Sequence, residues 1–357
     1  MADNPVRHRR ARLRAVLCVF TALLLMLLAT PLTHVAPAMA APLDPSIAAA
    51  RVEPGLVQIT TLVDFQGVVG NGAGIVLTPD GQVLTNHHVV AGANDIKAFS
   101  MGTGQTFEAD LLGYDRANDI ALLQLRGAQG LPVAPLGDSN TVALGEPVLT
   151  IGNANGSGNP MTHETGAVTN LSREIAAEDE LTGAKNSLGG LIQSSTNLRS
   201  GDSGGALVNS AGEVIGMNAA ATLNFTIDGD STPGGEGFAI PINRALDIAS
   251  QIRAGAASPA VHIGPSAMLG IGIAATGESE PGGLRVRSVL QGGPAGLAGV
   301  RPGDVITVID GVPIDSGNAL TGLLDQRYPG NVIDLNWLDR AGAPHNAKVT
   351  LVVGPVS

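Results

Sequence analysis

The sequence is poor in cysteine and in aromatic residues. Its 357 residues include one cysteine, Cys18, and Phe, Trp and Tyr together make up 3% of the chain. A single cysteine cannot close an internal disulfide. Any folded core must therefore be built mainly from Val, Leu, Ile and Ala, and it must hold by packing alone.

Positive charge is also scarce. Lys and Arg number 20 against 31 Asp and Glu, which gives a formal net charge of -11. Five of the arginines lie within the first 14 residues, so the rest of the chain is more acidic still. Binding to nucleic acid requires clustered Lys and Arg that neutralise phosphates. The charge distribution therefore argues against a nucleic-acid partner.

One apolar run predicts export. Ala15–Ala29 follows the arginines and is short for a helix that spans a bilayer. Ala38-Met39-Ala40 then offers the small residues that a signal peptidase requires. We expect residues 1–40 to be a cleaved signal peptide, which leaves no stable membrane span and directs the protein to the cell envelope or the medium. An uncleaved membrane anchor is the alternative.

Short apolar runs separated by turn signals predict a mainly β protein. Hydrophobic residues make up 44% of the chain, and its 48 Gly and 22 Pro suit many turns. Two sets of runs, at about 52–135 and 146–242, predict two small barrels or sandwiches. Thr78-Pro79-Asp80-Gly81 predicts a hairpin within the first set. The runs are Leu56–Ile59, Ala73–Leu77, Gln82–Thr85, Ile120–Leu125, Pro147–Ile151, Leu191–Gln193, Ala206–Val208 and Val214–Met217.

The last third of the chain reads as a second unit. Arg244–Arg253 has the apolar stripe of a short helix. Residues 254–265 combine Gly, Pro, Ala and Ser without periodicity, which is typical of a linker. The predicted organisation is therefore a first domain at 41–253, the linker, and a C-terminal domain at 266–357.

Three residues in a defined order predict nucleophilic catalysis. Ser203 lies in Gly201-Asp202-Ser203-Gly204-Gly205, His88 follows a predicted strand, and Asp119 precedes another. A serine hydroxyl needs a base to take its proton, and a carboxylate must hold that base in one tautomer. The order His, Asp, Ser is that of chymotrypsin-type proteases, whereas subtilisin and the α/β-hydrolases use other orders.

For each of these residues, a competing residue or an ordinary interpretation must be considered. His87 would point away from His88 on an extended backbone, so we interpret it as a bystander. Asp115 competes with Asp119, but it lies in a turn beside an arginine and needs no catalytic role. The Gly-rich segment also fits the G-x-S-x-G motif of an esterase, which requires a later histidine. The later histidines, His262 and His345, fall in the predicted linker and C-terminal domain, which disfavours the esterase.

The glycines beside Ser203 suggest a second part of the site. Backbone N–H groups of Gly201 and Ser203 can converge on one point only if the chain takes turns that a Cβ would obstruct. Convergent donors are what a tetrahedral oxyanion requires. A plain Gly-rich turn is the alternative.

Four motifs resemble the HtrA family of PDZ-bearing, trypsin-fold serine proteases. They are Leu84–Val90, Asp119–Leu123, Gly201–Gly205 and Gly237–Pro241. The stretch Ile96–Pro132 most resembles secreted mycobacterial members. The sequence departs from the usual pattern where His87 and Asp202 replace Asn, and neither change touches the triad. The resemblance implies a chymotrypsin/trypsin-like double β-barrel followed by a C-terminal PDZ domain.

The resemblance also implies a specificity pocket around Asn197, Arg199, Met217 and Phe238. Asn197 stands six residues before Ser203, where Arg/Lys-cutting enzymes keep an Asp. Without that charge a basic side chain would be unpaired in the pocket. We expect cleavage after small or medium aliphatic residues, and Phe238 could equally belong to the core.

The C-terminal domain has its own motifs. Met268–Ile273 resembles the carboxylate-binding loop of PDZ domains, and 288–311 resembles their central strands. A helix beginning near Asp315 or Ser316 would form one wall of a peptide groove. The residues predicted to line it are Leu269, Gly270, Ile271, Leu320 and Leu323, although some leucines must simply fill the core.

Together these features predict an exported serine endopeptidase that cleaves unfolded or damaged proteins. Its PDZ domain would bind C-terminal peptides, and no metal or cofactor is implied. The alternative is a chaperone-like binding protein with low or conditional protease activity. Family members often trimerise through an N-terminal aromatic segment, but Ala41–Glu53 has no aromatic residue. An oligomer formed by another route stays open.

Overall fold

A computed structural model describes residues 42–63, 68–156, 160–178, 185–219, 226–227, 230–231, 235–273 and 282–356. The predicted signal peptide at 1–40 and its cleavage site lie outside the described residues. By their internal contacts, residues 41–357 form one unit. The predicted domain boundaries within this unit stay predictions.

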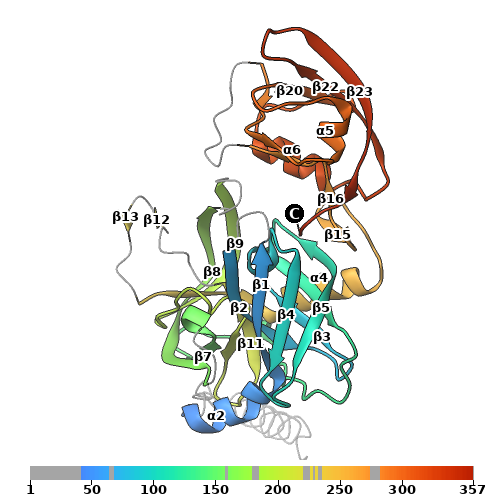
Figure 1. Cartoon of the computed structure of the whole chain (residues 1–357). Helices are drawn as coiled ribbons and strands as arrows, with labels where there is room; N and C mark the ends of the chain where they lie inside the picture. Colours follow the sequence, from blue (N-terminus) through green and yellow to red (C-terminus); the bar gives the residue numbers. More distant parts are fainter. Residues whose placement is uncertain are drawn as a thin grey trace, which may run out of the picture. The chain divides into compact units, whose positions relative to one another are not determined.

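The first barrel has six strands. They follow the order β5-β4-β1-β2-β3-β6, and pairing of β5 with β6 closes the sheet. The hairpin predicted at Thr78–Gly81 is confirmed, since Gly81 N donates to Thr78 O at 3.0 Å. The strands are β1 (Leu56–Val63), β2 (Val68–Val76), β3 (Gln82–Thr85), β4 (Asp95–Ser100), β5 (Thr106–Asp115) and β6 (Ile120–Leu125) (Figure 1).

The second barrel is closed in the order β10-β11-β14-β9-β8-β7. All four apolar runs predicted in this region lie in its strands. These are β7 (Pro147–Gly152), β8 (Thr162–Glu178), β9 (Lys185–Ser194), β10 (Ala206–Val208), β11 (Val214–Asn218) and β14 (Gly237–Pro241). A separate small ribbon pairs β12 (Thr226–Ile227) with β13 (Asp230–Ser231).

Alternate side chains of the first barrel enter two different cores. Val57 and Val83 pack inside the barrel. Their neighbours Leu56 and Leu84 face the other way and join a cluster that also holds Ile151 of the second barrel. Because successive side chains on a strand point to opposite faces, one alternating pattern fills both cores. The shared cluster holds the two barrels together beside the candidate site.

The helices before, within and after the barrels are short. The helix predicted at Arg244–Arg253 is confirmed as α4 (Ile242–Arg253), and its buried residues include Ala245, Ile248 and Ile252. No helix among the described ranges is long and apolar enough to cross a membrane. The others here are α2 (Pro45–Val52), η1 (Glu53–Gly55), α3 (His87–Val90), η2 (Ser139–Thr141) and η3 (Ala154–Gly156).

The segment predicted as a linker contains a strand, β15 (Val261–Ile263). It pairs antiparallel with β5, and His262 lies opposite Tyr114. Gly113 permits this approach, because a Cβ there would lie 2.4 Å from the carbonyl oxygen of His262. The composition of 254–265 therefore did not indicate the strand that it contributes to the edge of the first sheet.

The C-terminal domain is a small sheet packed on two helices. Ser316 caps the helix predicted near it, since its Oγ accepts from Ala319 N at 3.2 Å. Leu269, Leu320 and Trp337 share one buried core. The elements are β16 (Ala267–Met268), β17 (Ile271–Gly272), β18 (Leu284–Arg285), β19 (Ser288–Val289), α5 (Pro294–Ala298), β20 (Val305–Ile309), β21 (Val312–Pro313), α6 (Gly317–Leu324), β22 (Val332–Leu338), β23 (Pro344–Thr350) and β24 (Val352–Val353).

Candidate active site

His88 stands where β3 gives way to the short helix α3. The backbone is helical here rather than extended, yet the two neighbouring histidines still diverge. His87 is buried, and its ring centroid lies 4.8 Å from that of Tyr114. The side chain of His88 is 46% exposed and faces Asp119 and Ser203.

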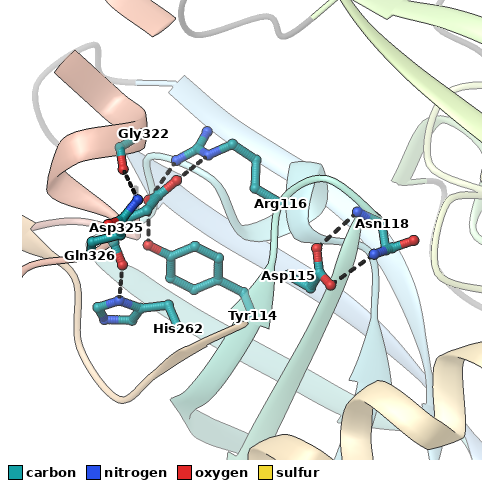
Figure 2. A network of polar contacts seen from close by, with 8 residues as sticks. All are labelled: Tyr114, Asp115, Arg116, Asn118, His262, Gly322, Asp325 and Gln326. Carbon is teal, nitrogen blue, oxygen red and sulfur yellow. Dashed lines mark hydrogen bonds and ion pairs between the residues drawn. The ribbon is translucent and has the colours of Figure 1, made fainter. Parts of the chain in front are cut away.

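Asp119 contacts His88 at two points, one on the imidazole and one on the backbone. Its Oδ2 lies 2.8 Å from Nδ1 of His88, and its Oδ1 accepts the backbone N–H of His88 at 3.0 Å. The competing Asp115 instead accepts from the backbone and side chain of Asn118 (Figure 2). The geometry therefore brings His88 together with Asp119, and Asp115 serves the turn beside it.

The backbone of Asp119 is in an unusual conformation. Its φ of 54° lies in the left-handed region, which non-glycine residues rarely adopt. The side chain of Asn86, fully buried, donates to the carbonyl oxygen of Asp119 at 3.1 Å. Sequence reasoning missed this residue, because no local pattern indicates which distant carbonyl a side-chain amide will reach.

Ser203 comes from the second barrel and completes the group. Its Oγ lies 2.8 Å from Nε2 of His88. The glycines around it are required by neighbouring carbonyl oxygens. A Cβ on Gly204 would lie 2.1 Å from Ala73 O, and one on Gly205 would lie 2.1 Å from Ile151 O. The Gly-rich segment is thus packed between the two barrels and is more than a plain turn.

Gly201 has a φ of 95°, and a Cβ there would lie 2.2 Å from Asn153 O. Its own carbonyl accepts from Asn153 N at 3.3 Å, which fixes the orientation of the loop. The N–H groups of Gly201 and Ser203 donate to no carbonyl among the residues that the structure describes. Asn153 was another residue that the sequence did not single out.

Asp202, directly before Ser203, is buried. Its Oδ1 accepts from Thr162 Oγ1 at 2.5 Å, and its Oδ2 accepts from Arg199 N at 2.9 Å. Burial raises the pKa of this carboxyl, and the hydrogen bond from Thr162 opposes that shift. Asp202 therefore anchors the loop that carries Ser203, at a position where ionisation is costly.

The residues predicted for the specificity pocket lie in two environments. Met217 and Phe238 are buried in the cluster that joins the barrels. Asn197 and Arg199 are exposed on the loop before Ser203, and the guanidinium of Arg199 contacts Glu164 at 2.7 Å. The specificity assignment stays a prediction.

The residues predicted to line the peptide groove also lie in different environments. Leu269, Leu320 and Leu323 belong to the core of the small domain. Gly270 has a φ of 80°, and its carbonyl accepts from Leu290 N at 2.9 Å. Ile271 starts the strand β17, which pairs with β19. The three leucines thus build the domain, and their role toward a peptide stays a prediction.

Two family descriptions match this chain: a trypsin-like peptidase domain at residues 72–217 and a PDZ domain at residues 285–333. Serine protease PepD of Mycobacterium tuberculosis is 33% identical over 333 residues, or 88% of this chain and 69% of PepD. The serine protease Do-like HtrA of Lactococcus lactis is 31% identical, over 78% of this chain and 70% of that protein. The chain belongs to the HtrA-type serine proteases that carry a PDZ domain.

Further HtrA-type proteins are similar to it. HhoA of Synechocystis, named a putative serine protease, is 34% identical over 76% of this chain and 68% of its own length. The solved structure of the HtrA-type protease AlgW with a tripeptide is 30% identical, covers 87% of this chain and 98% of AlgW, and has a TM-score of 0.49. As a family member, the chain is a serine endopeptidase with a mainly β, trypsin-like domain followed by a PDZ domain.

Proposed function

We propose that this HtrA-type protein is an exported endopeptidase that cleaves unfolded or damaged proteins through an acyl-enzyme on Ser203. The observation that carries the proposal is the pair of 2.8 Å contacts that connect Asp119 to His88 and His88 to Ser203. A serine hydroxyl becomes a nucleophile when an adjacent base takes its proton. The serine protease relatives support the same chemistry.

In this mechanism Ser203 Oγ attacks the carbonyl carbon of the substrate's peptide bond while Nε2 of His88 takes the hydroxyl proton. Asp119 keeps Nδ1 protonated and stabilises the imidazolium that forms. His88 then passes its proton to the leaving amine, and the C–N bond breaks. Water, activated in turn by His88, hydrolyses the acyl-enzyme and restores the hydroxyl.

The backbone N–H groups of Gly201 and Ser203 are the proposed donors to the oxyanion. Only glycine fits at 201, because Asn153 O occupies the position of a Cβ. Removing one such donor in a serine protease costs about 10²–10³ in kcat. The left-handed backbone of Gly201 is therefore part of the proposed machinery.

The relatives also support a proposal about location and substrate class. Relatives named periplasmic serine endoprotease DegP-like, such as that of Halomonas elongata at 33% identity, support export to the cell envelope. The match to a PDZ domain supports binding of peptide segments. We propose that the PDZ domain binds C-terminal peptides and that cleavage follows small or medium aliphatic residues.

Labelling with a fluorophosphonate tests the nucleophile. The unchanged chain should form an adduct on Ser203, located by mass spectrometry of its peptides. Ser203→Ala should form none, while the control Ser210→Ala should react like the unchanged chain. An unlabelled Ser203, with and without added peptide, would contradict the endopeptidase and favour a binding protein without catalysis.

Asp119→Asn tests the carboxylate. The amide would present the wrong tautomer of His88 to Ser203, so kcat for a peptide substrate should fall by about 10⁴. Asp115→Asn is the comparison variant, because it alters the neighbouring turn without removing a contact to His88. A near-normal rate in Asp119→Asn would show that another carboxylate orients the base.

A further inference from the structure

The turn that carries Asp119 is built from partly buried polar contacts. It connects β5 to β6, and Asp115 accepts from Asn118 N at 3.0 Å and from Asn118 Nδ2 at 2.8 Å (Figure 2). Asp119 N donates to the carbonyl oxygen of Arg116 at 3.2 Å. An aspartate that bonds to the backbone a few residues further on stabilises a turn. Because Asp119 N bonds to the carbonyl oxygen of Arg116, the position of Arg116 helps to fix the left-handed backbone conformation of Asp119.

A carboxylate from the C-terminal domain binds this turn. Nε of Arg116 donates to Oδ2 of Asp325 at 2.9 Å, and Nη2 donates to Oδ1 at 3.3 Å. The hydroxyl of the buried Tyr114 donates to the same Oδ1 at 2.7 Å. The two charged side chains are only 17% and 15% exposed, so water screens the pair weakly. Paired donors of this kind fix direction as well as distance.

The backbone of Asp325 is held as well. A ring nitrogen of His262, Nδ1, lies 2.7 Å from Asp325 O (Figure 2). The ring of His262 stacks on Tyr114 on one side and on Tyr328 on the other, with centroids 5.0 and 4.8 Å away. Asp325 itself caps the end of α6, where its N–H donates to Thr321 O at 2.8 Å. The side chain and the carbonyl oxygen of Asp325 are thus both held by residues of the first sheet and its edge strand β15.

From these contacts we propose that Asp325 is a positioning residue for the catalytic triad. It acts through Arg116 and Tyr114, which flank Asp115, on the turn that ends at Asp119. The proposal rests on the proposed role of Asp119. Loss of the carboxylate removes the two hydrogen bonds from Arg116 and the one from Tyr114. The turn then loosens and Asp119 is misplaced toward His88, while the substrate-binding side of the second barrel is untouched.

The test compares Asp325→Ala and Asp325→Asn with Asp310→Ala in the full chain. Asp310 makes a similar, partly buried ion pair with Arg327, but wholly inside the C-terminal domain. Steady-state hydrolysis of a peptide should show kcat lowered about tenfold in the Asp325 variants, with KM unchanged. The rate of fluorophosphonate labelling should fall in parallel, and Asp310→Ala should keep the normal rate. Thermal unfolding shows that each variant is folded.

Exchanging the charges of Arg116 and Asp325 tests whether Asp325 positions the turn or only stabilises the fold. The double variant Arg116→Asp/Asp325→Arg should recover part of the rate that either single variant loses. Unchanged or increased kcat in Asp325→Ala, an equal loss in Asp310→Ala, or failure of the exchange to restore any rate would overturn the proposal. Absence of a Ser203 adduct in the unchanged chain would refute the triad itself, which is a different result.

Discussion

At the scale of single residues, the proposed catalytic chemistry depends on a residue with an unusual backbone conformation. Asp119 combines a φ of 54° with two contacts to His88. A left-handed non-glycine residue costs about 1–2 kcal/mol, and the surrounding hydrogen bonds must offset this cost. Asn86 and the Arg116 turn supply such bonds. The strained backbone thus belongs to the residue that carries the proposed catalytic carboxylate.

Asp202→Asn tests the cost of a buried charge beside Ser203. Burial raises the pKa of Asp202. A carboxyl with a raised folded pKa stabilises the fold below its unfolded pKa, and this contribution is lost as pH rises through the folded pKa. The midpoint of thermal unfolding should therefore be higher for Asp202→Asn at pH 7 to 8, and the difference should shrink as pH falls.

Asp110→Asn is the control with the opposite sign. The hydrogen bond from Arg126 lowers the pKa of Asp110, so its contribution is present above the unfolded pKa and is lost on acidification. This variant should gain no stability at neutral pH. A difference between Asp202→Asn and the unchanged chain that stays constant with pH would show that ionisation is not its cause.

At the scale of secondary structure, local apolar patterns were sufficient for several strands and for one helix. The strands Gln82–Thr85 and Ile120–Leu125 have the predicted bounds, and the helix at Arg244–Arg253 begins two residues earlier than predicted. The strand β15 was missed. Its partner β5 lies far back in the sequence, so nothing within 254–265 announces the pairing.

Gly113→Ala tests whether β15 needs this close approach. The new methyl group would lie 2.4 Å from His262 O and 2.8 Å from Ile252. Forcing such overlap should lower the free energy of unfolding by about 1–3 kcal/mol, measured with urea. Gly322→Ala is the control, since nothing lies within 4 Å of its Cβ in α6, and it should gain about 0.5–1 kcal/mol. Equal stability of the two variants would contradict the tight pairing.

At the scale of the whole molecule, the segment after β24 packs into the first barrel. Val356 is buried among the side chains of that core, with Val89 and Val90 next to His88. Its carbonyl accepts from Gly92 N at 2.6 Å, and its N–H donates to Ala93 O at 3.1 Å. A residue far along the chain thus supports the segment that follows the catalytic histidine candidate.

Val356→Ala should lower the free energy of unfolding by about 1–2 kcal/mol, because two buried methyl groups are removed. Val353→Ala is a matched control, since Val353 ends the preceding strand β24 and is 62% exposed. Urea unfolding, followed by circular dichroism, measures both. Equal stabilities would show that the buried position of Val356 contributes nothing in solution.

Local sequence patterns were enough to predict the chemistry of this protein and to indicate its family. The order of His88, Asp119 and Ser203, the glycines of 201–205 and the alternation of apolar residues are local patterns, and each has a direct physical meaning. Which distant groups come into contact depends instead on the folded arrangement. Asn86 on Asp119, Asp325 on Arg116 and β15 on β5 depend on long-range packing, and side-chain donors carry no local signal of the acceptor they will reach.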